Sequence, residues 1–245
     1  MGGLLLNKKT NTIQMKIALL GYGKMGQAIE KIALERGHEI VLKKDEFNTY
    51  EGLTNADVAI DFSIPMVAVE NISSCFHANV PVISGTTGWL DHYEEMVSLC
   101  KAKNGAFISS SNFSLGVNLF FELNDYLAKM MAKFDSYNVE MEEIHHTQKL
   151  DAPSGTAISL AKGVIENSAY TKWTLEEPKS NEIHIEAKRI GTVPGTHTVT
   201  YNSPIDSIEI KHTAHNREGF ALGAVIAAEW IVGKKGIFSM KDVLN

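Results

Sequence analysis

The 245-residue chain has little cysteine and proline, and it carries less positive than negative charge. Its two cysteines, Cys75 and Cys100, have no metal-type spacing, which favours buried thiols in a reducing compartment and predicts a cytoplasmic protein. Six prolines and 19 glycines exclude a collagen-like or disordered chain. The formal net charge of -6 argues against a nucleic-acid partner, because such proteins present a basic face. An anionic ligand must therefore be bound by local groups.

Long hydrophobic runs are also missing. The longest one near the C-terminus, residues 220–228, ends at Glu229, whereas a membrane-spanning helix needs ~18 apolar residues. The leucines in residues 1–6 follow no basic start, so we expect neither a signal peptide nor a membrane partner. Residues 1–14 lack periodicity and are predicted to be an N-terminal tail, which leaves open whether they belong to the native protein.

The first half of the chain alternates short apolar runs with amphipathic segments. The pattern predicts strands at 16–20, 39–42, 58–60, 80–84 and 106–109, and helices at 27–36, 65–77 and 89–103. Strands that alternate with helices of this length are typical of a parallel, doubly wound α/β sheet.

The pattern changes after about residue 115. Helices are predicted at 117–134 and 154–167, and strands at 138–144, 183–187 and 208–210, with apolar side chains at every second strand position. This alternation predicts a sheet with one buried face and one face at solvent or at an interface. A final amphipathic helix begins near Phe220. We therefore expect a dinucleotide-binding domain of residues 15–115 and 216–245, and an inserted α+β domain with a mixed sheet at 116–215.

A glycine-rich loop links the first predicted strand to the first predicted helix. Gly21, Gly23 and Gly26 fit the G-x-G-x-x-G pattern, with Lys24 and Met25 between the last two glycines. The first glycine permits a tight turn, the second lets the backbone approach a pyrophosphate, and the third lets helix and strand pack closely. A Gly-rich turn without a ligand is the alternative, but the strand–turn–helix context favours a Rossmann-type dinucleotide site.

The end of the second strand bears on the choice of cofactor. Asp45 and Glu46 lie near the position where an acidic residue binds the ribose hydroxyls of NADH. Lys43 and Lys44 precede them and could instead pair with the 2′-phosphate of NADPH. A solvated charged turn is a third interpretation, so the sequence leaves NADH and NADPH open.

Two further loops follow predicted strands. Residues 61–65, which include Phe62 and Ser63, follow the third strand, and residues 85–88, which include Gly85 and Thr87, follow the fourth. Either loop alone is more typical of a plain turn. Together, at the carboxyl ends of successive strands, they favour one dinucleotide crevice.

Residues 145–157 hold the densest set of chemical groups. Two imidazoles (His145 and His146) and an ammonium (Lys149) precede a Pro-Ser-Gly-Thr helix start at 153–156. Free N–H groups and hydroxyls at such a helix start bind anions, so a carboxylate-bearing substrate fits. One histidine is a plausible proton donor near neutral pH.

Simpler interpretations exist for each of these groups. Adjacent histidines point to opposite faces of a strand, and no further ligand has suitable spacing, so no metal site is expected. Ser154 alone is more typical of an N-cap than of a binding group. A nucleophilic serine is disfavoured because no G-x-S-x-G elbow exists.

The whole stretch from His145 to Ala157 resembles the signature of the 4-hydroxy-tetrahydrodipicolinate (dihydrodipicolinate) reductases of bacterial lysine and diaminopimelate synthesis. The resemblance covers most of the chain from Met15 onward. Its other motifs are Gly21-x-Gly23-x-Met25-Gly26, Asp61-Phe62-Ser63-x-Pro65, Gly85-Thr86-Thr87-Gly88, Asn112-Phe113-Ser114-x-Gly116-Val117-Asn118, Arg189-x-Gly191, Gly195-x-His197 and Phe220-Ala221-x-Gly223-Ala224.

The resemblance implies a reaction and a set of roles. A nicotinamide would deliver hydride to C4 of a cyclic imine dicarboxylate, formed as the 4-hydroxy substrate loses water, to give tetrahydrodipicolinate. His145 would be the general acid, with Lys149 as a second candidate proton donor and carboxylate ligand. The remaining implied carboxylate ligands are His146, Ser154, Gly155 and Thr156. Implied nicotinamide contacts are Gly85, Thr87 and the backbone of Ser111, Asn112 and Phe113.

The resemblance also implies an α+β domain that forms a homotetramer and a last helix that returns to the first domain. The two-faced strands near 183–189 and 208–211 independently suggest self-association. Two departures from the family are visible. The chain is somewhat short, and Lys43-Lys44-Asp45-Glu46 replaces an acidic-then-arginine pair, which puts the cofactor preference in doubt.

Two rival functions remain at this stage. Another Rossmann oxidoreductase, such as an amino-acid or semialdehyde dehydrogenase, would share the fold but does not account for the His-His-x-x-Lys cluster. A nucleotide-sensing module without catalysis would keep the glycine loop but would need no proton donor beside an anion site.

Overall fold

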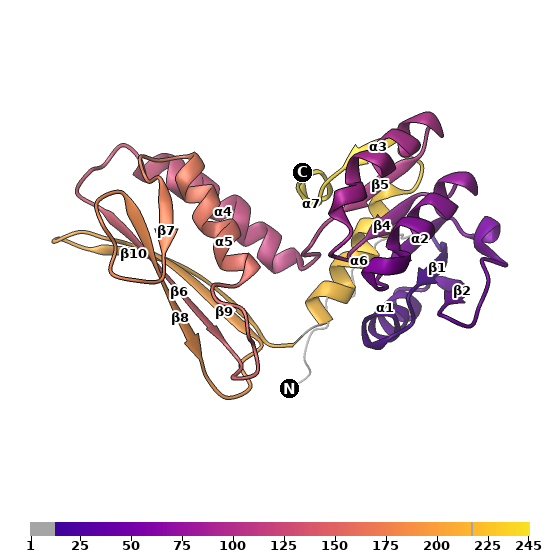
Figure 1. Ribbon diagram of the computed structural model, residues 1–245, viewed down its shortest axis with the longest axis horizontal. Helices are drawn as coiled ribbons and strands as arrows, with labels where there is room; N and C mark the ends of the chain where they lie inside the picture. The colour runs from indigo at the N-terminus through magenta and orange to yellow at the C-terminus, as the bar shows by residue number, and fades with distance from the viewer. Residues whose placement is uncertain (1–12, 217) are drawn as a thin grey trace, which may run out of the picture. The chain divides into compact units, whose positions relative to one another are not determined.

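The computed structural model describes residues 13–216 and 218–245, which form two compact units (Figure 1). One unit ends at Phe113 and resumes at Ala221–Asn245, and the other is Ser114–Phe220. Of the expected N-terminal tail, residues 1–12 lie outside the described residues, and Ile13 and Gln14 belong to no helix or strand.

The first unit is built on a six-stranded parallel sheet with the order β11-β5-β4-β3-β1-β2. Because the chain passes from β1 to β2 on one side and then to β3 on the other, the strand order reverses between β1 and β3. Ligands of such sheets bind outside the carboxyl ends of the strands at this reversal. The strands are β1 (Lys16–Leu20), β2 (Glu39–Lys44), β3 (Val58–Asp61), β4 (Val82–Ser84), β5 (Ala106–Ser109) and β11 (Gly236–Phe238).

The helices of this unit pack on the buried, apolar strands. Helices α2 and α3 contact each other and contribute Ile72, Phe76 and Met96 to one hydrophobic cluster. The end of α1 is linked to α6 through an ion pair between Arg36 and Glu229. The bounds are α1 (Lys24–Glu35), α2 (Pro65–His77), α3 (Tyr93–Ala102), α6 (Glu218–Ile231) and α7 (Met240–Leu244), with short 3₁₀ turns at Leu53–Asn55 and Leu90–His92.

The second unit is a mixed sheet covered on one face by two helices, α4 and α5, which lie side by side (Figure 1). The strand order is β10-β9-β6-β8-β7, in which β6, β8 and β7 are parallel and β9 and β10 run antiparallel to their neighbours. Its elements are α4 (Leu115–Met131), β6 (Asn138–His145), α5 (Gly155–Glu166), β7 (Lys172–Thr174), β8 (Glu182–Arg189), β9 (Gly195–Asn202) and β10 (Ser207–Ala214).

Strand alternation divides the residues of this second sheet between two faces. Val139 and Met141 of β6 and Ile185 of β8 face the helices and belong to the core of the unit. The other face is polar and is called the open face below. A hollow on it is lined by residues of four strands, among them Glu140, Glu142, His184, Glu186, Thr198, Thr200 and Glu209.

The predicted fold class, a parallel Rossmann-type sheet with a second mixed-sheet domain, is confirmed. Several boundaries differ from the sequence prediction. Helix α1 begins at Lys24 rather than residue 27, because Gly23 has extended backbone angles and serves as its N-cap. The predicted helix at 89–103 is split into a 3₁₀ turn and α3. Three strands were not predicted at all, namely β7, β9 and β11.

Candidate active site

The site in the second unit begins with two polar side chains on the helix-facing side of β6. Glu143 and His145 follow Val139 and Met141 at every second position, and all four are buried. A strand with this alternation normally places apolar residues on the buried face. Glu143 and His145 therefore break the pattern at the carboxyl end of the strand, which is typical of a functional site.

The Glu143 carboxylate is fully buried and satisfied by two donors. Its Oε2 accepts a hydrogen bond from the Ser154 backbone N–H at 3.0 Å, and its Oε1 accepts one from Nη2 of Arg189 at 3.1 Å. Burial by itself would raise the pKa of Glu143, but the hydrogen bonds from Ser154 and Arg189 outweigh it and hold the pKa below its ordinary value. Glu143 is therefore an anion at neutral pH.

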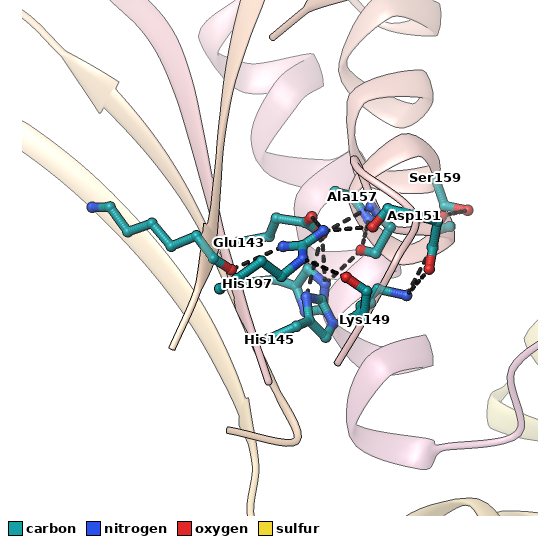
Figure 2. A network of polar contacts seen from close by, with 11 residues as sticks. Glu143, His145, Lys149, Asp151, Ala157, Ser159 and His197 are labelled. Atoms are coloured by element: carbon teal, nitrogen blue, oxygen red, sulfur yellow. Dashed lines mark hydrogen bonds and ion pairs between the residues drawn. The ribbon is translucent and has the colours of Figure 1, made fainter. Parts of the chain in front are cut away.

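Two imidazoles lie against this carboxylate. His145 Nδ1 is 3.6 Å and His197 Nε2 is 3.8 Å from Oε2 of Glu143, and the two rings meet edge to face with centroids 5.0 Å apart. Figure 2 shows the three side chains gathered at one point between the strands and the start of α5. Burial lowers the pKa of His145, against the attraction of Glu143, and burial lowers the pKa of His197 to about 4.

Helix α5 begins beside these side chains. The Ser154 hydroxyl caps the helix by accepting a hydrogen bond from the Ala157 N–H, and it lies 3.1 Å from Nε2 of His197. The first turn contains no acidic residue, Gly155 is exposed, and no atom lies within 4 Å of where its Cβ would be. A helix start with free N–H groups and open space in front of it can receive a carboxylate.

The loop between β6 and α5 carries the other predicted groups. His146 and Thr156 are half-buried, and the ammonium of Lys149 is ion-paired with Asp151 at 2.7 Å. Arg189 of β8 donates hydrogen bonds to the backbone oxygens of Lys149 and Asp151. The structure thus brings all six predicted catalytic and substrate-binding residues to the end of β6 and the start of α5.

Glu143, His145 and His197 also form a group whose potential metal-ligand atoms lie within 4.8 Å of one another in the described part of the chain. The Arg189 guanidinium occupies one oxygen of that carboxylate, and the Lys149 ammonium lies in the adjacent loop. Two cations at this point favour an anionic ligand over a metal cation.

The glycine loop of the first unit fits a dinucleotide. Gly21 has a φ of +96°, and a Cβ there would lie 2.2 Å from the backbone oxygen of Phe62. A Cβ on Gly26 would lie 2.3 Å from the oxygen of Gly21, whereas nothing lies within 4 Å of a Cβ on Gly23. Gly21 and Gly26 are thus required by packing, and Gly23 leaves space at the uncapped start of α1, an arrangement that suits a pyrophosphate. Lys24 and Met25 form the first turn of that helix.

The end of β2 holds a charged cluster. Lys43 is ion-paired with Glu30 and lies over the ring of Tyr22, whose hydroxyl also donates to Glu30. Asp45 is exposed, and its carboxylate accepts a hydrogen bond from the backbone N–H of Phe47. Lysine and carboxylate side chains are both present at the ribose position, so the choice between NADH and NADPH stays open.

Buried Asp61 ties the two later loops together. Its carboxylate accepts hydrogen bonds from the hydroxyls of Ser63, Ser84 and Thr86 and from the amide of Asn71, all between 2.7 and 2.9 Å. Burial raises the pKa of Asp61 against these donors. Sequence reasoning placed Asp61 in a motif but gave it no role. Asp61 is the last residue of a fully buried strand, and a carboxylate at such a position was the sequence signal that could have indicated its structural role.

The remaining predicted cofactor residues lie in these two loops and in the segment between β5 and α4. A Cβ on Gly85 would overlap the Phe62 ring at 2.2 Å, and the Phe62 ring packs on that of Phe113 with centroids 5.6 Å apart. Thr87 and Ser111 are exposed, and Asn112 is half-buried. The structure therefore places Phe62 against both Gly85 and Phe113. Thr87 and Ser111, each two residues from one of these positions, are exposed.

Sequence reasoning missed three site residues in the second unit. Glu143 lies two positions before His145 on an alternating strand, so strand periodicity could have found it. Arg189 and His197 were quoted only as motif residues, and their approach to Glu143 depends on pairing of β6 with β8 and β9. In the first unit Thr86 was likewise overlooked as a hydrogen-bond partner of Asp61.

A parallel sheet with a dinucleotide-type glycine loop, together with a second unit that sets histidines beside an anion-binding helix start, defines a two-domain nicotinamide-dependent oxidoreductase. Family comparison narrows this class. The family description "Dihydrodipicolinate reductase, N-terminus" matches residues 15–113, and "Dihydrodipicolinate reductase, C-terminus" matches residues 116–244. The chain belongs to the dihydrodipicolinate reductase family, as its sequence motifs predicted.

Individual relatives of the chain carry the name of the same enzyme. The chain is 58% identical over 234 residues to the 4-hydroxy-tetrahydrodipicolinate reductase of Christiangramia forsetii, covering 94% of this chain and 98% of that one. It is 36% identical to the enzyme of the same name from Methanosarcina mazei, and the match covers 100% of this chain and 95% of that enzyme. In fold it is similar to the dipicolinate-bound dihydrodipicolinate reductase of Paenisporosarcina sp. TG-14, with a TM-score of 0.74, 22% identity, and coverage of 93% and 98%.

No helix among the described residues is long and apolar enough to cross a membrane.

Proposed function

We propose that the protein reduces 4-hydroxy-tetrahydrodipicolinate to tetrahydrodipicolinate, with loss of water, in lysine and diaminopimelate synthesis, and that NADH or NADPH is the reductant. Membership of the family and the names of its relatives support the reaction. One observation carries the proposal. His145, the candidate acid, lies next to a helix start that has free N–H groups, the Ser154 hydroxyl and a nearby Lys149 ammonium.

In this proposal each of the two domains binds one ligand. Residues 15–115 and 216–245 bind the dinucleotide, and residues 116–215 bind the dicarboxylate and mediate self-association. The uncapped start of α1 in front of Gly23 supports the first assignment. The groups around α5 support the second.

The substrate carboxylates are bound at the start of α5. The backbone N–H groups of Gly155 and Thr156 and the hydroxyl of Ser154 donate to one carboxylate. Lys149 and His146 neutralise the second. Lys149 must leave its ion pair with Asp151 to do so, which an exposed pair permits because such pairs contribute only ~0–1 kcal/mol.

His145 supplies the proton. A reduced nicotinamide, when bound, supplies the hydride that C4 of the substrate ring receives. Burial lowers the pKa of His145, so the free site holds a mainly neutral imidazole near neutral pH. A bound dianion raises that pKa, and His145 can then take up a proton and donate it through Nε2, the nitrogen that does not face Glu143. The proton goes to the ring carbon between C4 and the imine carbon, which carries the electron pair after hydride adds to C4. Lys149 is the second candidate donor.

The cofactor contacts come from four segments of the first domain. The pyrophosphate lies against the loop of Gly21, Gly23, Lys24, Met25 and Gly26, and Asp45 approaches the ribose. The nicotinamide half is contacted by Phe62, Ser63, Gly85, Thr87 and the backbone of Ser111, Asn112 and Phe113. The Asp61 hydrogen bonds, which fix two of these loops, support this arrangement.

The open face of the second sheet supports a homotetramer in the cytoplasm. Both long helices of this unit, α4 and α5, lie on the opposite face of the sheet (Figure 1), which leaves the open face for other copies of the chain. Light scattering should therefore give the mass of four chains, and a monomer mass would refute the assembly. Free, buried Cys75 and Cys100 support a reducing compartment.

A coupled assay tests the reaction. A synthase condenses pyruvate with aspartate semialdehyde, and the purified protein should then oxidise NADH or NADPH, measured as loss of the nicotinamide absorbance. The control omits the semialdehyde. No loss of absorbance with an active synthase would reject the proposed function.

A further inference from the structure

The proposed reaction leaves one buried ion pair of the second unit without a role. Glu143 has no exposed side-chain surface, and its Arg189 partner keeps 20%. Removing two charges from water is costly, and a well-packed apolar pair is often at least as stabilising as a buried ion pair. The position of this pair beside the candidate acid therefore calls for an explanation other than stability.

The ion pair holds the loop between β6 and α5 in its middle and at its last residue. Glu143 accepts the Ser154 N–H at the point where α5 begins. Arg189 donates to the backbone oxygen of Lys149 at 3.3 Å and to that of Asp151 at 2.5 Å. A planar guanidinium is suited to such simultaneous contacts because its five N–H donors have fixed directions. The residues proposed to bind carboxylates are thus tied to two neighbouring strands.

The same carboxylate faces the candidate acid. Oε2 of Glu143 lies 3.6 Å from Nδ1 of His145, a buried nitrogen that has no hydrogen-bond partner among the described residues. The remaining charged or titratable groups around His145 are Lys149 and Asp151 from the loop, Arg189 from β8 and His197 from β9. The two cations disfavour a protonated His145, whereas Glu143 favours it.

We propose that Glu143, paired with Arg189, is a positioning residue that orients His145 for proton donation and fixes the loop that binds the substrate carboxylates. The inference rests on the proposed function, because it assigns Glu143 to the same site. Glu143 does not touch the substrate. It acts through His145, Ser154 and the backbone contacts of Arg189.

Glu143→Gln tests the electrostatic half of this role. Glutamine keeps the shape of the side chain but loses the charge that favours protonated His145. We expect kcat/KM to fall about 10- to 100-fold, the scale of a misplaced catalytic group. The high-pH limb of the kcat/KM profile should also move to lower pH, because a general acid acts only while protonated. A purely structural residue would not move that limb.

Glu142→Gln is the matched control. Glu142 precedes Glu143 on the same strand but lies on the open face, where Lys188 is its ion-pair partner. This variant should retain the wild-type pH profile. If Glu143→Gln has a kcat/KM within about twofold of wild type and an unmoved high-pH limb, the positioning role is rejected.

Arg189→Lys tests whether the ion pair fixes the loop between β6 and α5. This variant remains informative if Glu143→Gln does not fold. Lysine keeps the charge but loses the directed contacts to the Lys149 and Asp151 carbonyls. KM should rise about tenfold or more, and binding of the probe pyridine-2,6-dicarboxylate should weaken similarly, with a smaller effect on kcat. Unchanged probe binding would overturn the loop-fixing role.

The two proposals fail in different ways. If wild-type protein oxidises neither NADH nor NADPH in the coupled assay, the proposed function fails. If wild type is active but both variants retain its KM and its pH profile, only the positioning role fails.

Discussion

At the scale of single residues, His197 explains how His145, the proposed acid, can lie in a buried site with two cations nearby. Burial lowers the pKa of His197 to about 4, so that ring is neutral near neutral pH. It meets His145 edge to face and shares a hydrogen bond with the Ser154 hydroxyl. A neutral neighbour does not repel a proton arriving on His145, and the site can therefore charge when the dicarboxylate enters.

Replacing the proposed acid, His145, should affect turnover but not cofactor binding. His145→Ala should reduce turnover by roughly two to four orders of magnitude, the contribution of general acid catalysis, without weakening NADPH binding. Stopped-flow turnover and NADPH fluorescence titration measure the two effects. His92→Ala, which removes an exposed histidine of the other unit, is the control. Unchanged turnover in His145→Ala would remove this residue from its role.

The glycines of the phosphate loop should respond differently to the same substitution. Gly23 has a φ of -77° and open space around its missing Cβ, so Gly23→Ala should fold normally but weaken NADPH binding about tenfold, ~1.4 kcal/mol. Gly26→Ala places a methyl group against the Gly21 oxygen and should cost about 1–3 kcal/mol of stability. Thermal melts and calorimetric titration compare them. Equal NADPH affinity in Gly23→Ala and wild type would contradict a pyrophosphate at this helix start.

At the scale of secondary-structure elements, the end of α1 is fixed to α6 by a charge cluster. The Glu229 carboxylate accepts two hydrogen bonds from Arg36, both 2.7 Å long, and lies 2.8 Å from Nε2 of His38. Burial alone would raise the pKa of Glu229, but Arg36 and His38 outweigh it and lower the pKa. The folded state therefore favours the ionised carboxylate more than the unfolded state does.

This cluster makes stability depend on pH with a defined sign. Because the folded pKa of Glu229 is depressed, its contribution is present above the unfolded carboxylate pKa and is lost as pH falls through the folded value. Glu229→Gln should lower the free energy of unfolding by about 2–3 kcal/mol at neutral pH and by less near pH 4. Urea denaturation at both pH values measures this difference. An equal loss at both would contradict the ionised pair.

Local sequence signals were sufficient for some elements and insufficient for others. The strands β1, β3 and β5 are continuous apolar runs, so their burial on both faces was visible in the sequence. Strand β9 was missed although its threonines alternate with His197, Val199 and Tyr201, which is a period-2 pattern of residues that favour strands. Its place between β6 and β10 depends on long-range pairing. The short strands β7 and β11 have three residues each, too few for a periodic signal.

The residues of the candidate site also differ in whether local sequence could predict them. His145, Lys149 and Ser154 lie within one short stretch, so the sequence predicted them together. Glu143 and Arg189 are separated by 46 residues and meet only because β6 and β8 pair in register. Contacts that depend on strand pairing cannot be read from local spacing.

At the scale of the whole molecule, a net charge of -6 coexists with two anionic ligands in the proposed reaction. Acidic residues gather on the open face of the second sheet, where Glu140, Glu142, Glu186 and Glu209 line one hollow. The proposed anion sites instead rely on helix starts and on Lys149. The overall charge therefore describes the surface and gives no indication of the ligands of either site.

The most direct test of the proposed reaction follows the transferred hydrogen. Wild-type protein is supplied with the condensation product and with NADPH or NADH carrying deuterium at the transferable position of the nicotinamide. The product, analysed by mass spectrometry and NMR, should be tetrahydrodipicolinate with one deuterium at C4 of the ring. Unlabelled tetrahydrodipicolinate, or oxidation of the nicotinamide without this product, would contradict the account.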